Sequence, residues 1–139
     1  MIRKLPYFIA FLAFLFSVKN VTSQVVNQKI VDAFGSEYVD QLVKTNENHL
    51  NYLNCFLDYS YEIVENTYVV GHKFPLASSF LKKLKHKKVN DYTPDINDFN
   101  VLMYSFPRDR ELKKSYRIDQ TDYLIVFFPE NEFVEIFNN

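Results

Sequence analysis

The residue types that most often carry out chemistry in proteins are scarce in this chain, and their spacing does not bring them together. The three histidines, at positions 49, 72 and 86, show none of the i, i+2 or i, i+4 spacings that place two imidazoles on one metal ion. His49 precedes Cys55 by about 600° of helical rotation, so the two side chains point to different faces and do not form a catalytic pair. We therefore expect surface or structural histidines and no metal site.

Glycine occurs only at positions 35 and 71. Phosphate-binding loops and the sharp turn that exposes a catalytic serine both need glycines at close spacing, because the backbone must approach phosphate or bend tightly. The sequence therefore disfavours nucleotide-dependent chemistry. We expect no nucleotide partner and no cofactor.

Two charged segments offer weaker candidates. Asp91, Asp95, Asn97 and Asp98 carry oxygens that suit calcium, but the segment lacks the third ligand and the glycine of an EF-hand loop, which favours a solvated loop. Arg108 opens a run of alternating charges that continues to Glu111, a pattern that suits anion recognition but is more typical of a solvated turn with weak ion pairs.

A lysine cluster is the feature with the clearest link to a partner. The segment from Asn66 to Asn90 contains no acidic residue, and an amphipathic helix there would dock on anionic lipid headgroups or polymers. Alternatively, the lysines complement the helix dipole and the acidic remainder of the same protein. The candidate residues for anionic-surface binding are Lys82, Lys83, Lys85, Lys87 and Lys88.

The N-terminus has the layout of a cleavable signal peptide. Arg3 and Lys4 precede an apolar stretch at positions 5–18, which is shorter than the roughly 20 residues of a membrane-spanning helix. Val21 and Ser23 then provide the small residues of a cleavage site. We expect a signal peptide over 1–23, cleavage between Ser23 and Gln24, and a periplasmic or secreted protein.

Residues 24–139 are long enough for one domain. The whole chain is 47% hydrophobic and 17% aromatic, which suffices for a sizeable core. Cys55 is the single cysteine and allows no internal disulfide; it is either a buried thiol or a link between chains. Without its signal segment the chain keeps 13 of its 16 basic residues and all 17 acidic residues, a formal charge of −4, so we expect no nucleic acid partner.

Periodicity predicts an α+β fold, with N-terminal helices packed on a C-terminal three-stranded antiparallel meander and a short terminal helix. The 47–64 helix is apolar on two sides, so it should be the central one. The last helix should bury Phe133, Ile136 and Phe137. The expected helices are 28–34, 37–44 capped by Ser36, 47–64, one from Pro75 through the lysine cluster, and one from Pro129; the expected strands are 99–106, 113–118 and 123–128.

The chain resembles small exported proteins of Bacteroidetes, flavobacteria especially. The resemblance is carried by the signal peptide ending in Ser-Gln, the AFGSEYVDQL segment at 33–42, the Tyr-rich helix, and the hairpin YRIDQTDYLIVF at 116–127 with its acidic-start helix. It implies a periplasmic or secreted location. It carries over no functional residues.

Three functions remain as hypotheses. The first is a non-enzymatic envelope or secreted protein that binds another protein or a surface. The second is a small extracytoplasmic enzyme, such as a hydrolase, whose carboxylates meet only in three dimensions. The third is an anionic-surface binder that acts through the lysine cluster. A closed polar cleft with two carboxylates would favour the enzyme, and an apolar patch the binder.

N-terminal sequencing tests the export hypothesis. The protein recovered from the periplasm or medium should begin at or within two residues of Gln24, because Val21 and Ser23 fit the cleavage site. A mature protein that retains Met1 and fractionates with membranes would contradict it.

Overall fold

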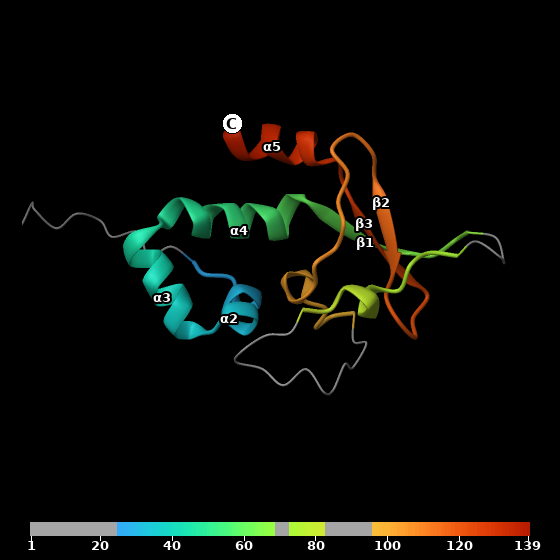
Figure 1. The fold of residues 1–139 in the computed structure, drawn as a ribbon, viewed down its shortest axis with the longest axis horizontal. Coiled ribbons are helices and arrows are strands. Elements are labelled where there is room, and N and C mark those ends of the chain that lie inside the picture. The colour runs from blue at the N-terminus through green and yellow to red at the C-terminus, as the bar shows by residue number, and fades with distance from the viewer. Residues whose placement is uncertain (1–24, 69–72, 83–95) are drawn as a thin grey trace, which may run out of the picture.

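The computed structural model describes residues 25–68, 73–82 and 96–139. Three helices are followed by a three-stranded antiparallel sheet and a terminal helix, so the predicted α+β class is confirmed (Figure 1). The elements are α2 (Gln28–Phe34), α3 (Ser36–Thr45), α4 (Glu47–Tyr59), β1 (Tyr61–Glu65), β2 (Lys114–Arg117), β3 (Tyr123–Phe127) and α5 (Glu130–Asn138), with short 3-10 helices η1 (Ala77–Phe80) and η2 (Val101–Met103).

Local sequence explains where the first two helices begin and end. The Asn27 side chain accepts a hydrogen bond from Lys29 N at 2.9 Å and caps α2, which has the predicted bounds. Gly35 ends α2 with φ 87° and ψ 152°, a conformation that is open essentially only to glycine. Gly35 also precedes α3 directly, so Ser36 is the first helical residue and not the cap that we expected.

Helix α4 is shorter than the sequence predicted. It ends at Tyr59, and residues 61–65 form β1 in place of the last turn of the expected 47–64 helix. Ser60 makes the change of direction: its hydroxyl donates to Phe56 O, and its own carbonyl accepts from Phe128 N at 3.0 Å. The backbone N–H and C=O groups of 61–65 therefore form hydrogen bonds with β3 and not within another turn of α4.

The sheet has the order β1-β3-β2, so the strand that comes last in the chain lies in the centre. Tyr61 pairs with Phe127, and Ile63 and Tyr116 lie on either side of Ile125. The predicted hairpin of 113–118 with 123–128 is confirmed. The predicted strand at 99–106 is wrong: this segment contains η2 and joins no strand of the sheet, so β1 provides the third strand.

The expected helix from Pro75 is also wrong where the structure describes it. The 3-10 helix η1 ends at Phe80, and Leu81 forms an antiparallel bridge with Tyr104. Lys82 N then donates to Met103 O at 2.9 Å, which is pairing between extended segments and not helical bonding. Residues 83–95 lie outside the described residues.

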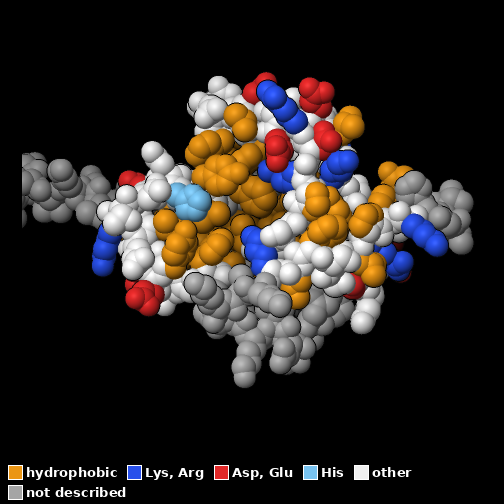
Figure 2. Space-filling view, viewed as in Figure 1, with side chains coloured by type: hydrophobic (Ala, Val, Ile, Leu, Met, Phe, Trp, Pro, Cys, Tyr) orange, Lys and Arg blue, Asp and Glu red, His pale blue; other side chains and the backbone are white. Residues whose placement is uncertain are grey.

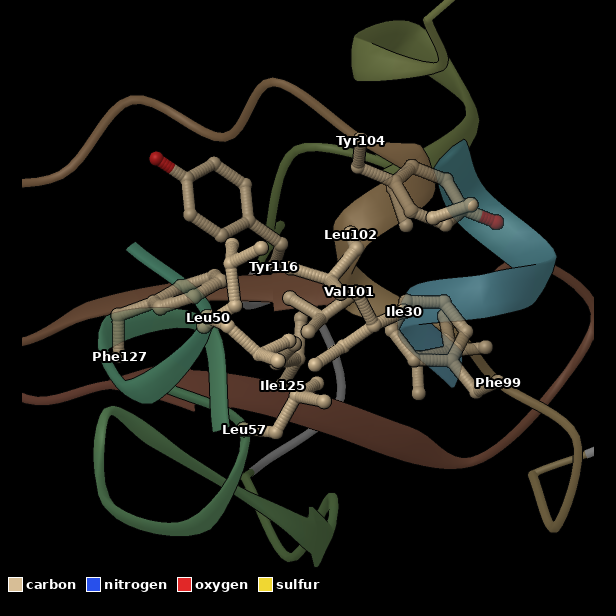
Figure 3. Packing of buried hydrophobic residues seen from close by; sticks show 14 of the residues in the cluster. Ile30, Leu50, Leu57, Phe99, Val101, Leu102, Tyr104, Tyr116, Ile125 and Phe127 are labelled. Carbon is tan, nitrogen blue, oxygen red and sulfur yellow. The ribbon is translucent and has the colours of Figure 1, made fainter. Parts of the chain in front are cut away.

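Helix α4 is central, as predicted. Leu50, Leu53 and Leu57 face the main core, in which they pack with α2, η2 and the sheet (Figure 3). On its other side, Tyr52 lies edge-on to Phe133 of α5, with ring centroids 5.4 Å apart. Burial on both sides explains why apolar residues occupy two faces of this helix.

Helix α5 lacks a side-chain cap, and backbone carbonyls replace it. Glu130 N donates to Asp109 O at 3.0 Å, and Asn131 N donates to Arg110 O at 3.2 Å. The predicted burial of Phe133 is confirmed, but Phe137 is only half-buried and Ile136 is 47% exposed. The reason is that α5 lies on the surface and covers α4 with only one face (Figure 1).

No helix within the described residues is long and apolar enough to cross a membrane.

Removal of the Phe127 ring should unfold the protein more readily than removal of an exposed side chain. Phe127 is 1% exposed and contacts rings from α4, β1 and β2. Phe127→Ala should therefore lower the free energy of unfolding by about 3–5 kcal/mol. Val134→Ala, at a site that is 50% exposed, should change it by less than about 0.5 kcal/mol. Urea denaturation followed by circular dichroism measures both, and equal effects would contradict the assignment of the core.

Candidate functional site

A cavity of about 440 Å³ lies between α4, residues 101–108 and β3. Figure 2 shows hydrophobic side chains gathered in the middle of one face of the molecule, with Lys or Arg side chains beside them. The residues that line the cavity are Phe34, Tyr52, Leu53, Phe56, Lys82, Val101, Leu102, Tyr104, Ser105, Phe106, Pro107, Arg108 and Phe127.

Aromatic rings form much of the cavity wall. Phe106 is central among them, because its ring centroid lies 5.1 Å from that of Tyr104 and 5.1 Å from that of Phe127. Phe106 also contacts Phe80 and Tyr116. The wall is held by packing between segments that are distant in sequence, so a ligand would meet surfaces that are already ordered.

The backbone of 101–108 holds its place through contacts at both ends. At one end, Asn100 is buried: its amide donates to Lys29 O at 2.7 Å, and its side-chain oxygen accepts from Leu102 N at 3.1 Å. At the other end, the Tyr116 hydroxyl donates to Pro107 O. Burial raises the pKa of this hydroxyl further above neutral pH.

Arg108 enters the cavity wall between three aromatic rings. Its guanidinium carbon lies 5.3 Å from the ring centroid of Phe56, 5.7 Å from that of Phe127 and 5.5 Å from that of Phe133. These distances fit cation–π attraction to the ring faces. The sequence predicted that this residue belongs to a solvated turn, and the structure contradicts this for Arg108, which is half-buried.

The hydrogen bonding of Arg108 is incomplete within the described part of the chain. Nη2 donates to Phe128 O at 3.3 Å, but Nε is buried and has no hydrogen-bond partner there. A buried donor without an acceptor costs about 1–3 kcal/mol, and more when the group is charged. Arg108 is thus a cation in the cavity wall that ring contacts and one backbone hydrogen bond hold in place.

Lys82 is the second cation of the cavity wall. Its Nζ donates to Leu102 O at 3.2 Å, and an ammonium group has three donors in all. Burial lowers the pKa of Lys82, because the charged form loses hydration. Among the described lining residues there is no Asp, Glu, His or Cys.

The structure tests the lysine cluster only in part. Lys82 lies in an extended segment beside the cavity, and not on the expected amphipathic helix. The other four candidates, Lys83, Lys85, Lys87 and Lys88, lie outside the described residues, so docking of the whole cluster on an anionic surface stays a prediction.

The remaining candidates do not form a site in the described part of the chain. Cys55 is half-buried on α4, and burial, followed by the charge of Asp58, raises the pKa of its thiol. Asp109 accepts from Glu111 N and Leu112 N, both at 2.9 Å, and these bonds lower the pKa of its carboxyl group. No three His, Cys, Asp or Glu side chains among the described residues are grouped to hold a metal ion.

The sequence did not reveal this cavity, because its walls come from segments up to 93 positions apart, from Phe34 to Phe127. The signals that do exist are the aromatic excess and an arginine that directly follows Phe106 and Pro107. An aromatic excess is usually explained by a hydrophobic core, and an arginine in a charged run by a surface turn. Comparison of the chain with protein-family models, with curated proteins and with solved structures gives no match.

Proposed function

We propose that this is an exported, non-enzymatic protein that binds a small apolar ligand in the cavity between α4, residues 101–108 and β3. The single observation that carries the proposal is the cavity itself, whose volume of about 440 Å³ falls in the usual range for small-molecule sites. Export is supported by the signal-peptide pattern at 1–23.

The composition of the wall supports binding by burial of apolar surface. Eight of the 13 lining residues are Phe, Leu, Val or Pro, and two more are Tyr. Each apolar group that leaves water for such a wall gains about 25 cal/mol per Å² of its surface. A ligand with an aromatic or aliphatic body would therefore be retained mainly by the hydrophobic effect and by ring contacts.

The same lining favours binding over hydrolysis. A pair of carboxylates is the usual machinery for general acid–base chemistry on a small substrate, and the described wall offers none. Ser105 lines the cavity, but no histidine lies with it there to act as a base. The enzymatic hypothesis thus finds no support at this cavity.

A neutral fluorescent probe tests the proposed site. N-phenyl-1-naphthylamine should bind the purified protein with saturable, one-to-one fluorescence enhancement, because the probe is small, aromatic and uncharged. Ser105→Trp should reduce this binding at least about tenfold, because Ser105 is exposed at the cavity and a larger side chain there would occupy the ligand volume.

Ser79→Trp is the matched control. Ser79 is exposed and does not line the cavity, so this variant should bind the probe as the wild type does. Thermal unfolding by circular dichroism checks that both variants fold. Unsaturable probe binding, or equal binding by the two variants, would contradict the proposal.

A further inference from the structure

We infer that the ligand of this cavity is a small molecule with an apolar body and a single carboxylate, which Arg108 and Lys82 bind. The inference rests on the proposed function, since it names the class of ligand for the same cavity. It is carried by two cationic side chains in a largely apolar wall, one of which is held in place by three aromatic rings.

Charge in the cavity wall is one-sided. Lys82 and Arg108 both line it, and no acidic residue does so among the described residues, although the whole chain has a formal charge of −1. A cleft with low-dielectric walls and charges of one sign concentrates ligands of the opposite sign. The local charge therefore selects an anion, while the rings select an apolar body.

The geometry at Arg108 matches a carboxylate. A guanidinium presents its N–H groups in a planar fork that fits carboxylate oxygens, and Arg108 lines the cavity with this group. The contacts with the rings of Phe56, Phe127 and Phe133 fix the orientation of the fork before a ligand arrives. An anionic oxygen that enters the cavity would therefore meet a guanidinium that is already oriented, while Nε itself stays buried against the protein.

Size and charge favour a carboxylate over a phosphate group. A phosphate monoester carries close to two charges at neutral pH, so it loses more hydration than a carboxylate does when it enters a largely apolar wall. Nη2 of Arg108 already donates to Phe128 O, and Lys82 Nζ already donates to Leu102 O. A monoanion with two oxygens suits the donors that are left.

Isothermal titration of the purified wild-type protein with 3-phenylpropionate and with its uncharged amide tests the inference directly. The acid should bind at least about tenfold more tightly than the amide, because hydrogen bonds to charged groups contribute that much in a partly buried site. The two probes share one apolar body, so the comparison isolates the carboxylate.

Variants then locate the carboxylate. Arg108→Gln and Lys82→Gln should each weaken binding of the acid about tenfold and leave binding of the amide nearly unchanged. Arg110→Gln is the matched control. Arg110 lies two positions after Arg108 and carries the same charge, but its side chain is exposed and does not line the cavity. It should leave both affinities unchanged.

Lys82→Gln keeps the inference testable if Arg108→Gln fails to fold. Arg108 packs on three rings, so its replacement can weaken the fold, and circular dichroism will show whether the variant is folded. Lys82 has no such ring contact among the described residues. The comparison of acid with amide needs no variant at all.

Each other outcome contradicts the inference in a distinguishable way. If the amide binds as tightly as the acid, and Ser105→Trp blocks both, the proposed function holds but the carboxylate assignment fails. If 2-phenylethyl phosphate binds more tightly than the acid, the anion is of another kind. If neither phenylpropionate probe nor the neutral naphthylamine binds, the inference and the proposed function both fail.

Discussion

The packing of aromatic rings around Phe127 is the interaction on which the rest of the structure depends. Phe127 lies on the central strand, and its ring contacts Phe56 of α4, Phe106 in the segment after η2, and Tyr116 of β2. Since the chain has a single cysteine, no internal disulfide supports the fold, and this packing must align helices and sheet by itself. The cavity lies beside these rings, and Phe56, Phe106 and Phe127 all form part of its wall.

The cavity and the fold share one set of residues, which links stability to binding. Arg108 holds rings of α4, β3 and α5 together, yet its Nε lacks an acceptor within the described chain. Stability alone would be served as well by an apolar residue at this position, since a buried charged donor is costly. A ligand anion beside Arg108 would offset part of the cost of its buried charge in the bound state and so add to the stability of the fold.

Much of the fold was predictable because it depends on local sequence. Gly35 separates two helices through a backbone conformation that other residues avoid. The hairpin of β2 and β3 follows from an alternating segment and an apolar segment on either side of a polar turn. The third strand was not predictable in this way. Tyr61 and Val64 continue the helical spacing of Leu57, and the same residues fit a strand once β3 is present to pair with them.

By itself, the sequence determined the α+β class, the helix bounds around Gly35, the terminal helix after Pro129, and the absence of glycine-rich phosphate loops. Only the tertiary structure decided that 61–65 is a strand, that 99–106 is not, and that Arg108 and Lys82 line one cavity. The physical reason is that propensity, capping and periodicity act over a few residues. Strand pairing and cavity walls depend on contacts between residues tens of positions apart, which a single sequence does not encode in any local pattern.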